Sequence, residues 1–190
     1  MTFPQPAELL GMPLTDAQVV RRVLAGDVEG FASLVDRYHA RCLRVATHLL
    51  ADGDDAEDAV QDAFVRAFRH LASYRDRDRF GAWIMRIVVN ECRTHAARQR
   101  RRLDGDLAAD SVALLYASDA HDALDRRLEL ERALLQLTPD QREAVVLRFT
   151  DDLSFDEMST ITGVGVSALK MRVQRACAQL RTLLVERLHA

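Results

Sequence analysis

The sequence predicts an all-α protein built from two small helical domains joined by an acidic, flexible linker. Of its 190 residues 8 are glycine, 4 are proline and 6% are aromatic, which is too little turn chemistry for a β-sandwich or barrel. Apolar residues recur instead every three or four positions. Residues 104–125 differ, with six aspartates and no lysine or arginine. We therefore expect domains at 14–103 and 126–190, the linker at 104–125, and a disordered leader at 1–13.

In the N-terminal domain, Thr15-Asp16 is typical of a helix start, and an apolar stripe from Phe31 to Leu50 predicts a second, buried helix. The third predicted helix carries acids in its first turns, which suits the helix dipole, and an apolar face that ends near Leu71. A polar loop, residues 74–79, then leads to a fourth helix that contains Trp83. This helix ends in a cationic cluster made of Arg98, Arg100, Arg101 and Arg102.

The C-terminal domain contains two capping boxes, Thr138-Pro139-Asp140-Gln141 and Ser154-Phe155-Asp156-Glu157. The second box opens a short helix, which is followed by the break Gly163-Val164-Gly165 and a longer amphipathic helix. Two helices joined by a glycine-containing turn predict a helix-turn-helix. From 166 to 184 the second helix has no acid and four basic residues, so it could lie in a DNA major groove. A solvated amphipathic helix is the alternative.

Several classes of function find no support in the sequence. No apolar stretch approaches the roughly 18 residues of a membrane span, so we expect a cytoplasmic protein without membrane insertion. Three cysteines without secretory context predict reduced thiols rather than disulfides. There is no glycine-rich phosphate loop, nucleophile elbow or dinucleotide fingerprint. We expect no catalytic residues, no enzymatic activity and no cofactor.

Two groups of side chains in the sequence are compatible with a metal site, and each also has a structural interpretation. The acids between Asp54 and Asp62 could bind divalent ions in a nuclease, but helix capping or protein docking explains them better, because no general base or nucleophile lies nearby in sequence. Cysteine and histidine also stand three residues apart twice, which is compatible with a Cys2His2 zinc site. We predict instead that the two cysteines are buried as small apolar residues. The four side chains concerned are His39, Cys42, Cys92 and His95.

Four segments, in the same order and spacing, resemble the bacterial sigma factors, specifically the extracytoplasmic-function (ECF) group of the sigma-70 superfamily. Residues 16–38 are similar to that family's opening helices, and residues 55–71, DAEDAVQDAFVRAFRHL, to its polymerase-docking helix. Residues 80–102 resemble the segment that opens and reads the minus-ten promoter element, and residues 137–181 the domain that reads the minus-thirty-five element. The resemblance covers nearly the whole chain.

The resemblance implies that the chain binds core RNA polymerase, through the β′ clamp helices and the β flap, and directs promoter-specific initiation. It also implies an anti-sigma factor as a regulator. The implied polymerase-binding residues are Asp55, Glu57, Asp58, Gln61, Asp62 and Arg66. Those implied for the minus-ten element, where Tyr74 would stack on an extruded base, are Tyr74, Arg75, Asn90, Arg93, Arg98, Arg100 and Arg101. Those for the minus-thirty-five element are Ser167, Lys170, Met171, Arg172, Gln174 and Arg175.

The helix after the glycine-containing turn, the predicted recognition helix, departs from the family's usual pattern, and two of the departures bear on DNA contacts. Ala168 stands where a threonine is common, and Met171 stands where a small polar residue is common. Met171 could therefore contact a thymine methyl group in the major groove. The alternative function is a stand-alone helix-turn-helix regulator, in which the N-terminal helices only dimerise or sense a ligand.

Overall fold

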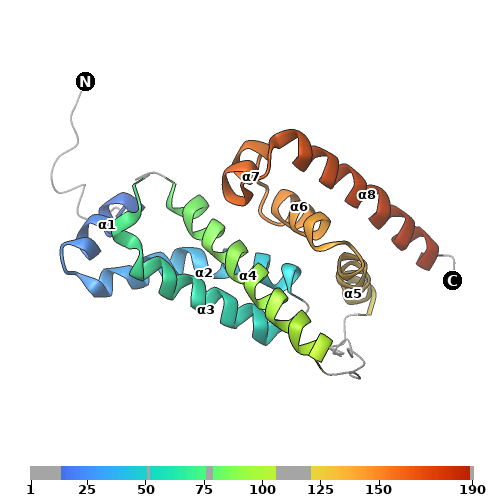
Figure 1. Ribbon diagram of the computed structural model, residues 1–190, viewed down its shortest axis with the longest axis horizontal. Helices are drawn as coiled ribbons and strands as arrows, with labels where there is room; N and C mark the ends of the chain where they lie inside the picture. Colours follow the sequence, from blue (N-terminus) through green and yellow to red (C-terminus); the bar gives the residue numbers. More distant parts are fainter. Residues whose placement is uncertain (1–13, 51, 76–78, 106–120, 189–190) are drawn as a thin grey trace.

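The computed structural model describes residues 14–50, 52–75, 79–105 and 121–188, and within these ranges all regular structure is helical (Figure 1). The predicted all-α class with two helical domains is confirmed for this part of the chain. The predicted leader, residues 1–13, lies outside the described residues, as do residues 106–120 of the predicted linker.

The N-terminal domain is a bundle in which α3 packs against both α2 and α4. Its first helix begins with Thr15, whose side chain accepts the N–H of Gln18 in a capping box. Asp52 caps the third in the same manner by accepting the N–H groups of Asp54 and Asp55. The elements are α1 (Asp16–Leu24), the 3-10 helix η2 (Val28–Phe31), α2 (Ala32–Leu49), α3 (Gly53–Arg69), the 3-10 helix η3 (Leu71–Ser73) and α4 (Phe80–Gly105).

The C-terminal domain contains both capping boxes that the sequence predicts, at Thr138 and at Ser154. Gly163 ends the short helix with φ +74°, a left-handed conformation that glycine adopts without a Cβ clash. The helix-turn-helix geometry follows from this turn. The elements are α5 (His121–Leu135), α6 (Pro139–Phe149), α7 (Phe155–Thr162) and α8 (Val166–Leu188).

The first helix of this domain begins earlier than the sequence analysis expects. The segment 121–125 belongs to α5, although its aspartates and weak periodicity favour a linker. At the other end of the linker, α4 continues through residues 104 and 105. Both helices therefore extend into the segment predicted to connect the domains.

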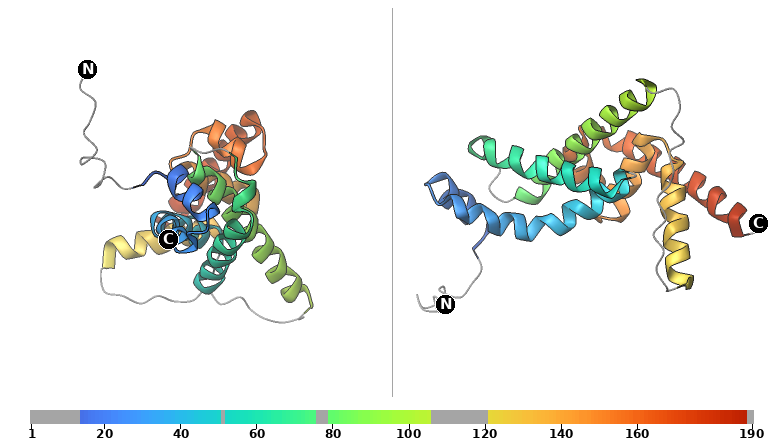
Figure 2. Two further views of the ribbon diagram at one scale, coloured as in Figure 1. Left: turned by 90° about the vertical axis from the view of Figure 1, so that its left-hand side faces the viewer. Right: turned by 90° about the horizontal axis from the view of Figure 1, so that it is seen from below.

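A hydrophobic core runs through both domains without interruption. It includes Leu34, Val60 and Ile84 from the N-terminal helices, and Leu147 and Met158 from α6 and α7. All five side chains are fully buried. Contacts of α4 with α7 and of α2 with α6 join the domains. A smaller core lies between α5, α6 and α8. The C-terminal end of α4 leaves this packed body and projects from it, as both views of Figure 2 show.

Candidate nucleic-acid and protein interfaces

The helix α8 presents one exposed stripe of polar and basic side chains. Its buried side, which includes Leu169, Val173 and Ala176, packs on the rest of the domain. The exposed positions are separated by three and four residues, so they share one face of the helix. These positions coincide with five of the six predicted minus-thirty-five contacts, namely Ser167, Lys170, Met171, Gln174 and Arg175.

The sixth predicted contact, Arg172, lies differently. It is half-buried, and its guanidinium lies 2.8 Å from a carboxylate oxygen of Asp140 in the first turn of α6. This ion pair holds α8 against α6. Lys170 keeps its ammonium 5.7 Å from the centroid of the Phe155 ring, which also carries the guanidinium of Arg148 at 5.5 Å. Arg148 is thus a cation near the stripe that the sequence analysis did not single out.

The projecting end of α4 carries a second basic surface. Arg98, Arg100 and Arg101, all predicted minus-ten contacts, are exposed there. Asn90 is also exposed, and its side-chain oxygen accepts a hydrogen bond of 3.2 Å from Arg93. Arg93 itself donates two bonds, of 2.7 and 2.8 Å, to the carboxylate of Glu143 on α6. These bonds raise the pKa of the guanidinium.

The side chain of Tyr74 lies in the core rather than on the surface. It is 8% exposed, and its ring centroid lies 5.1 Å from that of Trp83 and 5.7 Å from that of Phe80. Its hydroxyl accepts the N–H of Arg79 at 3.2 Å. In this arrangement its ring faces are covered, in contrast to the open stacking loop that the sequence predicts. Arg75 is exposed, and residues 76–78 of the loop lie outside the described residues.

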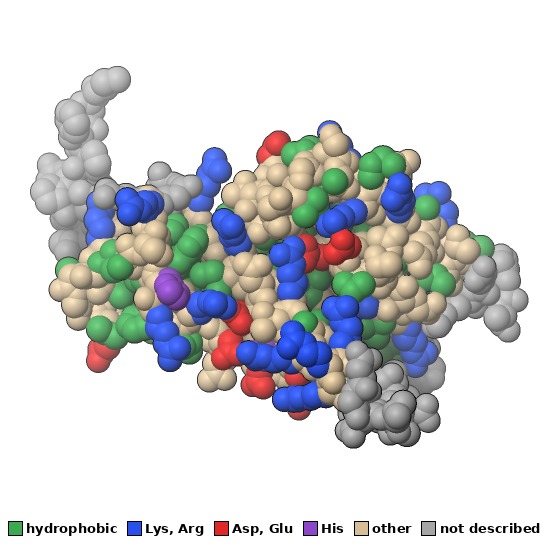
Figure 3. Space-filling model, viewed as in Figure 1, with side chains coloured by type: hydrophobic (Ala, Val, Ile, Leu, Met, Phe, Trp, Pro, Cys, Tyr) green, Lys and Arg blue, Asp and Glu red, His purple; other side chains and the backbone are tan. Residues whose placement is uncertain are grey.

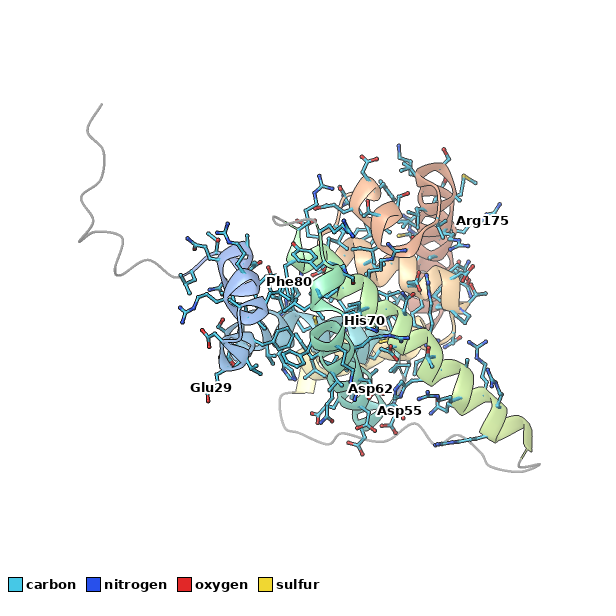
Figure 4. All side chains as sticks on the ribbon, turned by 60° about the vertical axis from the view of Figure 1, so that its left-hand side comes forward. Glu29, Asp55, Asp62, His70, Phe80 and Arg175 are labelled. Carbon is cyan, nitrogen blue, oxygen red and sulfur yellow. The ribbon has the colours of Figure 1, made fainter. Side chains whose placement is uncertain are left out.

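The helix α3 carries an acidic surface opposite its buried alanines. Five of the six predicted polymerase-binding residues are exposed, and Asp55 is half-buried. Figure 4 shows Asp55 and Asp62 pointing outward on one side of the molecule, away from Arg175 on α8. Arg66 forms an ion pair with Glu91, which is itself 6% exposed. This pair fixes the position of Arg66 relative to α4.

A polar groove separates α3 from the end of α4. One wall is acidic and the other mainly basic, and Nε2 of His95 lies 3.2 Å from a carboxylate oxygen of Asp62 across it. Figure 3 shows acidic and basic side chains side by side in the lower part of the molecule, where these two helices meet. The groove is lined by Asp55, Asp58, Gln61, Asp62, His95, Arg98, Gln99 and Arg102.

The structure does not assemble the metal sites that the sequence analysis considered. Within the described ranges, no three histidine, cysteine or acidic side chains form a group able to hold a metal ion. Cys42 and Cys92 are buried, and burial raises the pKa of each thiol to about 12. His39 stacks on Phe64 and His95 faces Asp62, so the histidines do not join the cysteines.

Two buried acids were missed by the sequence analysis. Glu91 and Glu143 are 6% and 8% exposed, and each neutralises an arginine that was predicted to act at an interface. The partners are 25 and 50 residues apart in sequence. No local pattern connects positions at such separations, so only the packing of the helices reveals these pairs.

None of the helices in the described ranges is long and apolar enough to span a membrane.

The fold and these surfaces define a two-domain helical protein with a helix-turn-helix and a separate basic helix end. The family description "Sigma-70 region 2" matches residues 34–102, and "Sigma-70, region 4" matches residues 127–180. The RNA polymerase sigma-H factor of Pseudomonas aeruginosa is 31% identical over 85% of this chain and 89% of its own length. The ECF RNA polymerase sigma-E factor of Escherichia coli is also 31% identical, over 86% and 91%.

Solved structures agree with these matches. CnrH, solved in complex with the cytosolic domain of CnrY, has a TM-score of 0.67 at 28% identity and covers 90% of this chain and 97% of its own. The sigma factor RpoE of Bartonella quintana, solved with the anti-sigma factor NepR, has a TM-score of 0.69 at 28% identity and covers 81% and 96%. The chain belongs to the sigma-70 family of RNA polymerase sigma factors, and within it to the ECF group.

Proposed function

We propose that this chain is a promoter-specificity subunit that docks on core RNA polymerase, reads the minus-thirty-five and minus-ten elements, and stabilises melted promoter DNA. The observation that carries the proposal is the presence in one chain of two separate basic surfaces, the exposed stripe of α8 and the projecting end of α4, beside an acidic surface on α3. The chain itself catalyses no bond change, and the reaction it directs belongs to the polymerase.

The minus-thirty-five element is assigned to α8. A single helix fits the major groove, and the exposed stripe of α8 places Lys170 and Arg175 where they can reach phosphates or base edges. Arg172 acts as a positioning residue, because its ion pair with Asp140 fixes the orientation of α8. Met171 is 47% exposed on the same stripe, so its thioether side chain can contact a thymine methyl group.

The minus-ten element is assigned to α4 and the loop before it. The exposed arginines at the end of α4 hold backbone phosphates, and the amide of Asn90 reads a base edge. Stacking of an extruded base on Tyr74 requires its ring to leave Trp83 and Phe80. Base capture therefore includes a movement of the Tyr74 side chain out of this aromatic cluster.

The acidic surface of α3 is assigned to polymerase docking, with the β′ clamp helices as its partner and the β flap as the partner of the C-terminal domain. Residues 106–120, which join α4 to α5, connect the two domains along the polymerase. Since each domain offers few phosphate contacts and the formal net charge is −3, the free chain binds DNA weakly. Tethering on the polymerase supplies the effective concentration that promoter recognition needs.

An anti-sigma factor is the proposed regulator. Two of the solved relatives were solved with a bound partner, the cytosolic domain of CnrY in one case and the anti-sigma factor NepR in the other. Both relatives align with this chain over most of their length, which supports a comparable partner for it. The signal that such a partner would transmit is a property of the partner.

Polymerase docking is tested by equilibrium binding of the fluorescently labelled chain to core polymerase. The double variant Asp58→Arg, Asp62→Arg reverses two charges of the α3 surface and is expected to weaken binding at least about tenfold, because like charges now face the partner. The matched control is Glu29→Arg, Asp36→Arg, which makes the same charge change at exposed positions outside that surface. Equal affinity of both variants would contradict docking through α3.

A further inference from the structure

Two polar pairs on adjacent turns join α3, the helix assigned to polymerase docking, to α4. In the first pair Nε2 of His95 lies 3.2 Å from Oδ2 of Asp62, and in the second Arg66 binds Glu91. On each helix the two members are four residues apart, so they lie on one face of that helix. The acid stands on α3 in the first pair and on α4 in the second. Two docking candidates are therefore each held by a side chain of α4.

In both pairs the member on α4 is the more buried one. The side chain of His95 is 12% exposed and that of Glu91 is 8% exposed, whereas those of Asp62 and Arg66 are each 57% exposed. The two side chains on α3 are thus open to a protein partner, and the two on α4 support them from behind. A side chain in the second position can orient a docking residue while touching little of the partner itself.

Charged groups face His95 from α3 and from its own helix. The polar groove between α3 and the end of α4 brings the imidazole together with three acids of α3 and two arginines of α4. One turn earlier on α4, Glu91 is engaged by Arg66. Helices α2 and α7 also pack on α4, but in the described part of the chain neither contributes to the lining of this groove. The three acids are Asp55, Asp58 and Asp62, and the two arginines are Arg98 and Arg102.

We propose that His95 positions Asp62 for polymerase docking and that protonation of His95 weakens this docking. The inference rests on the proposed function, which assigns Asp62 to the polymerase. Histidine is the side chain that ordinarily changes its charge between pH 5 and 8. A neutral ring with its proton on Nε2 donates a hydrogen bond to Asp62 and leaves the carboxylate its full charge. A protonated ring keeps this bond but adds a positive charge beside the carboxylate, so the acidic surface of α3 attracts a basic partner less strongly.

Equilibrium binding of the full-length chain to core polymerase at pH 8 and pH 6 tests the effect on docking. The wild type should bind about fivefold more weakly at pH 6, which is the effect of one unit charge at ion-pair distance in water. His95→Gln retains an N–H donor for Asp62 but cannot gain a charge, so it should lose this pH response. His95→Leu retains the bulk without the donor, so at pH 8 it should bind about two- to fivefold more weakly than His95→Gln.

The matched control is His39→Gln, which removes an exposed histidine on α2 and should keep the wild-type pH response. Circular dichroism of all three variants should match that of the wild type, because none of the substitutions removes a helix cap or a core side chain. A change in docking that persists with unchanged helix content is then a property of the α3 surface.

An NMR titration of the free chain tests the pair without polymerase. The carboxyl carbon resonance of Asp62 should show a step at the pH at which the His95 ring titrates, in addition to the titration of the carboxylate itself. This step should disappear in His95→Gln and persist in His39→Gln, because only the first variant removes the titrating partner of Asp62.

The outcomes distinguish this inference from the proposed function. A step at Asp62, together with a pH response of docking that His95→Gln abolishes, supports the inference. Absence of the step would overturn the pairing of His95 with Asp62. Equal pH responses of the wild type and His95→Gln would overturn the role of His95 in docking. If the wild type bound polymerase at neither pH, the proposed function would fail and the docking role of His95 with it, while a step at Asp62 would still support the pairing.

Discussion

Replacement of Phe80 by alanine should destabilise the N-terminal domain by about 4 kcal/mol. Phe80 is 0% exposed and lies at the centre of an aromatic cluster, with ring centroids 5.3 Å from Tyr38, 5.7 Å from Tyr74 and 5.5 Å from Trp83. Burial of the phenyl group contributes about 2 kcal/mol. Three aromatic contacts at about 0.7 kcal/mol each contribute another 2 or so. The sum lies within the range of about 3–5 kcal/mol that is typical of buried Phe→Ala changes.

Urea unfolding followed by tryptophan fluorescence measures this effect directly. Trp83 is the single tryptophan of the chain and a member of the cluster, so its emission reports on the N-terminal domain. The matched control is Phe149→Ala, because Phe149 is 64% exposed at the end of α6. It should change the free energy of unfolding by less than about 0.5 kcal/mol. A loss below about 1 kcal/mol for Phe80→Ala, or equal losses for both variants, would refute the reasoning about the aromatic cluster.

Three further predictions concern capping, titration and base readout. The Ser154 hydroxyl caps α7, and its hydrogen bond lowers the pKa of Glu157. Ser154→Ala removes this hydroxyl, so thermal unfolding should show that the free energy of unfolding falls by about 1 kcal/mol. An unchanged unfolding midpoint would contradict the cap. Burial raises the pKa of the Cys42 and Cys92 thiols from 9.0 to about 12. The thiols of the unfolded chain therefore ionise first as the pH rises, so their contribution to the free energy of unfolding is complete below pH 9 and is lost between pH 9 and about 12. The loss is at most about 1.4 kcal/mol per pH unit for each thiol. Urea titrations should show a weaker fall in Cys42→Ala, and an identical slope would exclude this cause. Met171→Ser should change the preferred minus-thirty-five sequence in a selection from random duplexes; an unchanged preference would end the thymine-methyl hypothesis.

Helix starts and the turn of the helix-turn-helix could be predicted from local sequence. Thr15, Thr138 and Ser154 each cap a helix as expected, because a cap involves residues only three positions apart. The start of α5 was predicted less well. Its first residues are acidic and weakly periodic, so the local pattern resembles that of a linker although the segment is helical.

In the candidate interfaces, too, some features could be predicted from local sequence and others could not. Exposure of the stripe on α8 follows from helical periodicity, and so does that of the acids on α3. The burial of Tyr74 does not follow from periodicity, because it depends on the packing of its ring against Phe80 and Trp83. The pairs of Arg93 with Glu143 and of Arg41 with Asp151 join positions 50 and 110 residues apart. Such contacts are set by domain packing, which no local pattern encodes.

The ion pairs of the buried acids Glu91 and Glu143, whose arginine partners stay partly exposed, also have a structural consequence. A buried arginine–carboxylate pair contributes little net stability, since desolvation offsets most of the attraction, whereas loss of one partner is strongly destabilising. Arg66 with Glu91 lies within one domain, and Arg93 with Glu143 lies between two. Both pairs therefore specify position more than they add stability. In the second case the position specified is that of one domain relative to the other.

Run-off transcription with purified core RNA polymerase tests the central claim most directly. Genomic fragments are transcribed with and without this chain, with Asp58→Arg, Asp62→Arg as the docking variant and Glu29→Arg, Asp36→Arg as its matched control. We predict discrete transcripts that require the chain, disappear with the docking variant and persist with the control. Absence of any chain-dependent transcript, with folded protein and core enzyme from the same organism, would contradict the account and favour a stand-alone helix-turn-helix regulator.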